Sequence, residues 1–125
     1  MAEALYPDES YKIVGVLFSV FNELGYGYQE KYYYKAIKNG LLKLGFKVAE
    51  QLYMTLRSDG KAIGGYYLDF LIDNKIILEI KVANAVYPQH IKQVHGYLTA
   101  HKLQLGIIGV ISKNGIITKR VVNLY

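Results

Sequence analysis

Cysteine and tryptophan are absent from this chain of 125 residues, and proline occurs only twice. Without cysteine there is no disulfide, no thiolate metal site and no thiol nucleophile. No apolar stretch approaches the roughly 18 residues that a membrane-spanning helix needs, so we expect no membrane partner. The segment from Met1 to Glu9 opens acidic and lacks the basic start of a signal peptide. These absences together favour a cytoplasmic protein.

The residues that are present have the composition of a folded protein. Hydrophobic residues make up 52% of the chain and charged residues 20%, which is not typical of a disordered segment. A length of 125 residues suffices for one core, so we expect a single domain over residues 1–125. The formal net charge of +5 permits a polyanionic partner such as nucleic acid, although an ordinary basic protein carries similar charge.

Apolar residues at helical spacing predict two helices near the start of the chain. The first, over residues 10–24, has Ser10 as its N-cap and ends at Gly25. The second covers residues 29–44 and has Gly45 as its C-terminal stop.

The remainder of the chain reads as strands and turns with one more helix. Turn residues stand at Ser58-Asp59-Gly60, at Asp73-Asn74 and at Asn114-Gly115, and the last pair is typical of a type I′ hairpin turn. Pro88 suits the first turn of a helix. The predicted strands are 46–57, 63–72, 76–82, 105–111 and 116–122, and the predicted helix is 88–101.

The predicted order is therefore α-α-β-β-β-α-β-β. Antiparallel hairpins followed by a helical crossover give a mixed sheet with helices packed against it, in the α/β (α+β) class. The strand over residues 76–82 is apolar on both sides of its charges, so we expect it at the centre of the sheet.

Three charged residues interrupt two of the apolar strands in this order. Glu79 and Lys81 lie one residue apart in a strand and therefore project from the same face. Asp69 lies in the preceding apolar strand, across a tight turn. Charges in a strand that otherwise favours burial are costly unless they are paired or bound to a metal.

Carboxylates on neighbouring strands can share one Mg²⁺, which takes oxygen ligands and keeps several waters. A lysine beside the metal can orient the attacking water or stabilise the transition state. The register that would bring Asp69 opposite Glu79 or Lys81 is not fixed by the sequence. A half-exposed hairpin whose charges form a weak surface pair is the alternative interpretation.

A helix-start motif adds to this pattern. Gly27-Tyr28-Gln29-Glu30-Lys31-Tyr32-Tyr33, the strands with Asp69 and Glu79-Ile80-Lys81, and the later helix with Gln93 follow one another in a family-like order. In this order the chain resembles the GxxExxY family of the PD-(D/E)XK nuclease-like superfamily. The resemblance implies a restriction-endonuclease-like core and Mg²⁺-dependent hydrolysis of phosphodiester bonds, with Mn²⁺ as a substitute. It also implies nucleic acid as the partner, with DNA favoured over RNA.

The resemblance also assigns roles to residues. Asp69 and Glu79 would be metal ligands, together with the backbone carbonyl of Ile80, and Lys81 would be the catalytic lysine. In addition, Glu30 would complete the acidic cluster, Gln93 would be an accessory polar residue and Gln51 would line the site. Leu68 stands where the superfamily name has proline.

Some residues have ordinary explanations as well. Tyr33 fits the helix core, where its phenol needs a polar partner. The remaining Tyr and Lys residues of 31–35 suit base stacking, or they simply cover apolar surface. Lysines 35, 38, 43 and 47 form either a basic flank for nucleic acid or a solvated helical face.

Two alternatives to a nuclease remain open on the same fold. One is a non-catalytic nucleic-acid-binding module, favoured by the net charge of +5. The other is an assembly subunit, with the terminal hairpin over residues 105–122 as the interface of a homodimer.

Overall fold

The computed structural model describes residues 5–124, and in this range it contains three helices and one five-stranded sheet. The predicted order of elements is confirmed. The first residues of the segment that lacks a signal-peptide pattern, residues 1–4, lie outside the described range. The elements are α1 (Pro7–Leu24), α2 (Glu30–Lys43), β1 (Val48–Ser58), β2 (Lys61–Ile72), β3 (Ile76–Val82), α3 (Pro88–His101), β4 (Leu105–Ser112) and β5 (Gly115–Val122).

The sheet has the order β1-β2-β3-β4-β5, so β3 is central as predicted. Only β3 and β4 run parallel, because α3 carries the chain from one to the other, and the remaining neighbours are antiparallel. The first five residues of β3, Ile76–Ile80, are all buried. Any charge in that stretch therefore lies in the interior of the sheet.

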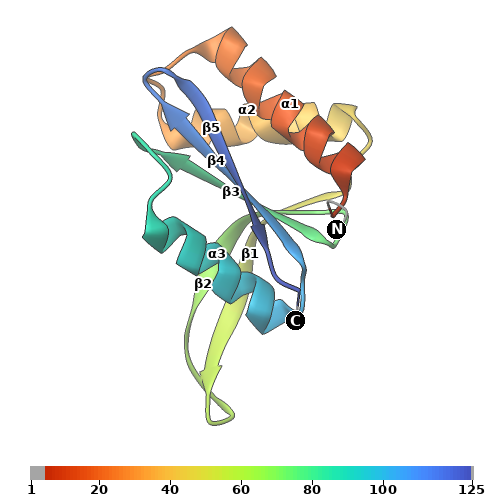
Figure 1. Ribbon diagram of the computed structural model, residues 1–125, viewed down its shortest axis with the longest axis vertical. Coiled ribbons are helices and arrows are strands. Elements are labelled where there is room, and N and C mark those ends of the chain that lie inside the picture. Colours follow the sequence, from red (N-terminus) through yellow and green to blue (C-terminus); the bar gives the residue numbers. More distant parts are fainter. Residues whose placement is uncertain (1–4, 125) are drawn as a thin grey trace.

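Two apolar cores form on the two faces of the sheet. In β3, Leu78 and Ile80 join the core with α1 and α2, whereas Ile77 joins the core with α3. Figure 1 shows α1 and α2 together at the top of the molecule and α3 lower down, beside the strands. Since side chains alternate along a strand, Glu79 and Lys81 point to the α3 side, like Ile77.

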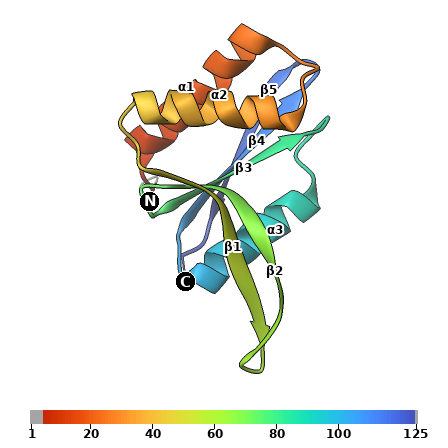
Figure 2. The same cartoon turned by 180° about the vertical axis from the view of Figure 1, so that it is seen from behind.

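The hairpin of β1 and β2 extends beyond the rest of the sheet. The strand β1 pairs with β2 along nearly its whole length, but β2 pairs with β3 only at Phe70–Ile72. Figures 1 and 2 show the hairpin projecting away from the helices. We call residues 53–67 the β1–β2 arm.

Several local predictions were wrong. The N-cap of α1 is Tyr6, in the left-handed conformation, and not Ser10. Ser10 is buried inside the helix, where its hydroxyl accepts a hydrogen bond from the Arg120 guanidinium at 2.5 Å. This partner is distant in sequence and could not be inferred from local spacing.

The hairpin turns were predicted with mixed success. Asp59 and Gly60 have φ values of 52° and 74°, which confirms the turn between β1 and β2. Between β4 and β5, Ser112 pairs with Gly115, so the turn residues are Lys113 and Asn114. Neither has a positive φ, and the predicted type I′ turn at Asn114-Gly115 is therefore wrong.

The terminal hairpin is not exposed as a whole. Every residue of β4 is buried, and only β5 lies at a sheet edge. Any pairing between two copies through this hairpin is therefore limited to β5. Within residues 5–124, none of the helices combines the length and the apolarity that a membrane crossing requires.

Candidate active site

The site predicted from the sequence lies where β2 separates from β3. The last ladder pair is Phe70 with Leu78, so Asp69 and Glu79 stand one step beyond it, at the same level. The Asp69 N–H donates to Glu79 Oε1 at 3.1 Å, and the Ile80 N–H donates to Asp69 Oδ2 at 2.8 Å. Each carboxylate thus binds a backbone N–H of the other strand where the ladder bonds end. The register that the sequence left open places Asp69 opposite Glu79.

Glu79 is 2% exposed, which is unusual for a carboxylate. Its burial, and then the charge of Asp69, raise the pKa of Glu79 to about 8, against the opposing effects of the Asp69 N–H and of Lys81. We call the junction where β2 separates from β3, at Asp69 and Glu79, the fork. Two carboxylates held close together at a partly buried position repel each other when both are ionised. The pair therefore favours either a shared proton or a cation.

Lys81 lies on the same face of β3 as Glu79, and Lys81 is half-buried. Its charge acts on two groups: it lowers the pKa of Glu79 and, after burial, it also lowers the pKa of His90. His90 lies in the first turn of α3, where its Nδ1 accepts a hydrogen bond from the Tyr87 N–H at 3.2 Å. Lys81 therefore lies between the acidic pair and the start of α3.

Glu30 is the first residue of α2 and is exposed. Its charge and that of Asp69 both raise the pKa of Tyr34, so the three groups share one neighbourhood. Across the part of the chain that the structure describes, no three His, Asp or Glu side chains are arranged to hold one metal ion. The structure therefore joins Asp69 and Glu79 directly and leaves Glu30 in an outer position.

Two tyrosines that the sequence analysis did not assign to the site flank the acidic pair. The Tyr34 side chain of α2 lies beside the Asp69 carboxylate, and its burial, followed by the charges of Asp69 and Glu30, raises its pKa. The Tyr34 ring also packs edge-on against Phe70, with centroids 5.9 Å apart. Tyr34 is four residues after Glu30 and so shares its helix face, which is the signal that would have found it.

Tyr97 approaches from α3 on the opposite side of the sheet. Burial and then the charge of Glu79 raise the pKa of Tyr97, while a hydrogen bond from Gln93 lowers it. The ring of Tyr97 stacks on Tyr66, with centroids 4.1 Å apart. Gln93 and Tyr97 are four residues apart in α3 and lie together on one face, with Tyr97 buried and Gln93 exposed at the rim.

Tyr33, the last residue of the helix-start motif, is fully buried, as its core interpretation predicts. Its hydroxyl donates to the Gly25 carbonyl at 2.6 Å and accepts from the Tyr28 N–H at 3.3 Å. The phenol thereby ties down the loop between α1 and α2. The motif tyrosine fixes the start of α2, and with it Glu30, without itself entering the site.

Gln51 in β1 stands at the level of Asp69, because Glu50 pairs with Phe70 and Leu52 with Leu68. It has a φ of 53°, in the left-handed region that residues with a Cβ avoid at a cost of about 1–2 kcal/mol. Its side chain is exposed. The backbone irregularity in β1 thus coincides with the fork between β2 and β3.

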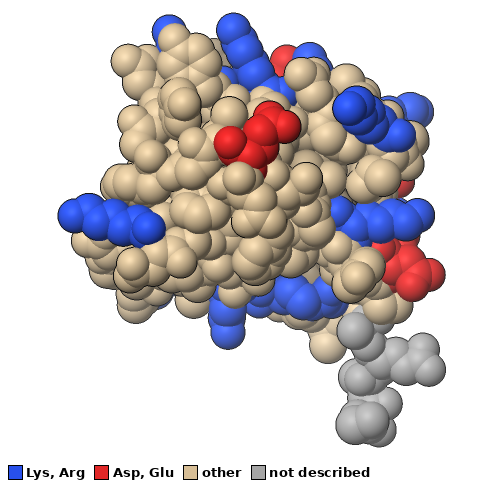
Figure 3. All heavy atoms as spheres, turned by 90° about the horizontal axis from the view of Figure 1, so that it is seen from above, with Lys and Arg blue, Asp and Glu red and all other residues tan. Residues whose placement is uncertain are grey.

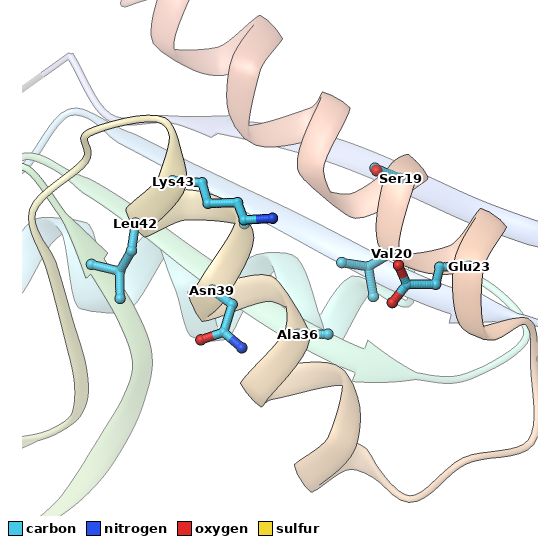
Figure 4. A pocket seen from close by; sticks show the side chains of 8 residues that line it. Ser19, Val20, Glu23, Ala36, Asn39, Leu42 and Lys43 are labelled. Carbon is cyan, nitrogen blue, oxygen red and sulfur yellow. The ribbon is translucent and has the colours of Figure 1, made fainter.

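A separate groove of about 700 Å³ lies between α1 and α2 (Figure 4). Its labelled side chains include Ser19, Glu23 and Asn39, and none of its lining residues belongs to the fork. It contains no carboxylate pair and no buried charge. The fork, and not this groove, therefore brings two carboxylates together.

Comparisons with known proteins agree with this fold and place the chain in a family. A model of the PD-(D/E)XK nuclease superfamily matches residues 7–116, and the chain belongs to this superfamily. No curated protein matches the chain.

Among solved structures, the chain is similar to an alkaline exonuclease (LHK-Exo) from Laribacter hongkongensis, with a TM-score of 0.57 and 14% identity. This match covers 98% of the chain and 72% of the exonuclease. A second similar structure, SSO0001, has a TM-score of 0.49 and 16% identity, covering 93% of this chain and 78% of that one. The likeness to the exonuclease shows that the two share a nuclease-like fold.

Proposed function

We propose that the protein is a metal-dependent nuclease that hydrolyses phosphodiester bonds of nucleic acid at the Asp69–Glu79 fork. The observation that carries this proposal is the carboxylate pair of buried Glu79 and half-buried Asp69, with Lys81 on the same face of β3 as Glu79. Oxygen ligands and a raised pKa fit a hard divalent cation, because the cation offsets the repulsion between the two carboxylates. Mg²⁺ is the proposed ion, with Mn²⁺ as a substitute.

In this proposal Asp69, Glu79 and the backbone carbonyl of Ile80 hold the ion. A bound divalent ion lowers the pKa of a water and offsets charge on phosphate oxygens. The Ile80 N–H fixes the Asp69 carboxylate, and the Tyr34 side chain lies beside it. That leaves Lys81 to stabilise the negative charge that develops on the phosphate.

Glu30 and Gln93 have supporting roles in the proposal. Glu30 is too far out to join the pair directly, so it acts through a water or through the electrostatic field of the site. Gln93 supports Tyr97 at the α3 side and presents its amide at the exposed rim. Both residues are positioned by helices that pack on opposite faces of the sheet.

Superfamily membership and the net charge of +5 support nucleic acid as the substrate, with DNA to be tested before RNA. We further propose a single domain of the GxxExxY type, which the motif Gly27–Tyr33 supports. The absence of cysteine supports a cytoplasmic location.

The test is cleavage of labelled DNA and RNA by the purified protein with Mg²⁺, with Mn²⁺ and with EDTA. Glu79→Gln and Lys81→Gln should each lower the rate by about 100-fold or more, as the loss of one electrostatic group commonly does. Glu23→Gln removes an exposed acid in the α1–α2 groove and serves as the matched control. A cleavage rate that is unchanged in Glu79→Gln or in Lys81→Gln would contradict the assigned site.

A non-catalytic nucleic-acid-binding module is the second candidate. The lysines along α2, described below, favour it independently of the fork. Binding that depends on salt but not on metal, together with no cleavage under any condition, would support the module over the enzyme.

A further inference from the structure

A second groove, of about 550 Å³, opens between α2 and β1. We call it the lysine groove. The residues that matter for its chemistry are Lys31, Tyr34, Lys35, Lys38, Glu50 and Gln51. It contains three of the chain's basic side chains and adjoins the groove between α1 and α2, with which it shares Asn39 and Leu42.

The helix geometry explains why the lysines gather there. Positions 31, 35 and 38 are spaced by four and three residues and therefore share one face of α2. Lys31 and Lys35 are exposed, whereas Lys38 forms an ion pair with Glu50 at 2.8 Å. Lys38 thus already bridges α2 to β1. Lys31, whose Nζ lies 5.2 Å from the centroid of the Tyr32 ring, and Lys35 are both exposed to an external anion.

The structure divides the basic flank that the sequence suggested. Lys43 lies in the groove between α1 and α2, on a different face from Lys35 and Lys38. Figure 3, a view onto the helical end, shows basic side chains set apart around a largely uncharged surface. A general positive patch does not cover that face, so the lysine groove is a local concentration of charge.

The lysine groove adjoins the fork through two residues. Tyr34 lines the groove and also lies beside the Asp69 carboxylate. Gln51 lines it too and stands opposite Asp69 in the register of β1 and β2. A strand of nucleic acid whose reactive phosphate lies at the fork therefore has a direct path along α2.

The left-handed backbone at Gln51 is an independent sign that this position matters. Strained conformations of residues with a Cβ cost about 1–3 kcal/mol and gather at binding and catalytic sites. Here the strained residue is exposed and faces the lysine groove. An amide at this point offers both a donor and an acceptor to a nucleotide.

From these observations we propose that the lysine groove binds a backbone phosphate of the substrate strand, next to the phosphate at the fork. Lys31 and Lys35 supply the positive charge, and Gln51 contacts the same nucleotide. The ion pair of Lys38 and Glu50 joins the α2 and β1 sides of the groove. This inference rests on the proposed function, because it takes the fork as the place of cleavage.

The experiment measures binding and not cleavage, so that the two proposals can fail separately. Fluorescein-labelled single-stranded DNA is titrated with the full chain in EDTA at several salt concentrations, and anisotropy is recorded. Lys31→Gln/Lys35→Gln should weaken binding about tenfold at low salt and reduce the slope of log K against log salt by about 0.7, for one phosphate that is no longer neutralised. Gln51→Ala should weaken binding without changing the slope.

The matched control is Lys113→Gln/Lys119→Gln, which removes the same charge at the opposite edge of the sheet. It should leave the slope close to that of the unmodified chain, and Lys31→Arg/Lys35→Arg should retain binding. The proposal is overturned if both glutamine pairs weaken binding equally, if the groove pair has no effect, or if the unmodified chain does not bind DNA. Selective loss in the groove pair with no cleavage would uphold the groove and refute the nuclease.

Discussion

The two halves of β2 differ in both strand pairing and burial. The inner half, residues 68–72, pairs with β1 and, at Phe70–Ile72, also with β3, and it contributes Leu68, Phe70 and Ile72 to the interior. The outer half, residues 61–67, pairs with β1 alone and exposes Ile63 to 63% and Tyr67 to 60%. One strand is thus a core element at one end and a projecting arm at the other.

This difference explains where the candidate site lies. When β2 leaves β3, the backbone N–H groups of Asp69 and Ile80 lose the ladder partners that they would otherwise have. The carboxylates of Glu79 and Asp69 accept those two bonds instead. A fork between strands therefore leaves two backbone N–H groups that acidic side chains can satisfy.

The largest expected effect tests the contrast between the halves. Phe70→Ala should destabilise the protein by about 3–5 kcal/mol, because it leaves a large cavity at a residue that is 1% exposed. Ile63→Ala, in the outer half, should change stability by no more than about 0.5 kcal/mol. Urea unfolding followed by circular dichroism measures both. A large loss in Ile63→Ala would mean that the arm is covered by another chain in solution.

The next test addresses the charge held at the junction. Since the pKa of Glu79 is raised from 4.5 to about 8, the folded state holds this proton more tightly than the unfolded state does. The stability that results is present below pH 4.5 and is lost as the pH rises to about 8. Melting temperatures in EDTA should therefore fall over this range more steeply in the unmodified chain than in Glu79→Gln.

Two additions make this test specific to the fork. Mg²⁺ or Mn²⁺ at pH 8 should restore part of the lost stability in the unmodified chain, since a cation favours the ionised pair. Asp59→Asn, at the exposed tip of the arm, should leave the pH profile unchanged. Equal profiles for the unmodified chain and Glu79→Gln would show that Glu79 is ionised without penalty.

Sequence periodicity predicted the elements well where the signal was local. The bounds of β3 and α3 match the structure, because an apolar run between turns and a proline at a helix start are local features. The N-cap of α1 was wrong because Ser10 is held by Arg120 from β5, a partner that spacing cannot reveal. Leu44, the last residue of the helix predicted over residues 29–44, lies just after the end of α2 and is 49% exposed.

The sequence predicted which residues form the acidic pair, but it did not predict how they are arranged. Asp69, Glu79 and Lys81 stood out as charges in apolar strands, but their register depended on where β2 leaves β3. Tyr34 and Tyr97 were missed as site residues because their roles come from the packing of α2 and α3 on opposite faces of the sheet. Backbone strain at Gln51 has no sequence signal, since glutamine does not favour a positive φ.

A smaller effect should appear at Gln51, where β1 passes from sheet to arm. Gln51→Gly should be more stable than Gln51→Ala by about 1 kcal/mol, because glycine adopts a positive φ without strain. Thr55, in the arm, does not have a positive φ, so Thr55→Gly should be less stable than Thr55→Ala by about 0.5–1 kcal/mol. Urea unfolding of the four variants gives the comparison. The same sign at both positions would contradict the strained geometry at the junction.

The smallest expected effect tests whether the arm is ordered at all. Tyr53 and Tyr67 face each other across the arm, with ring centroids 5.1 Å apart in an edge-to-face arrangement. A double-mutant cycle with Tyr53→Ala and Tyr67→Ala should give a coupling of about 0.5 kcal/mol, as expected for an exposed cross-strand aromatic pair. The stacked pair Tyr66 and Tyr97, which joins the base of the arm to α3, should couple more strongly, by about 1 kcal/mol. Zero coupling for the first pair and a clear value for the second would mean that the arm frays in solution while its base stays fixed, so that order ends close to the fork.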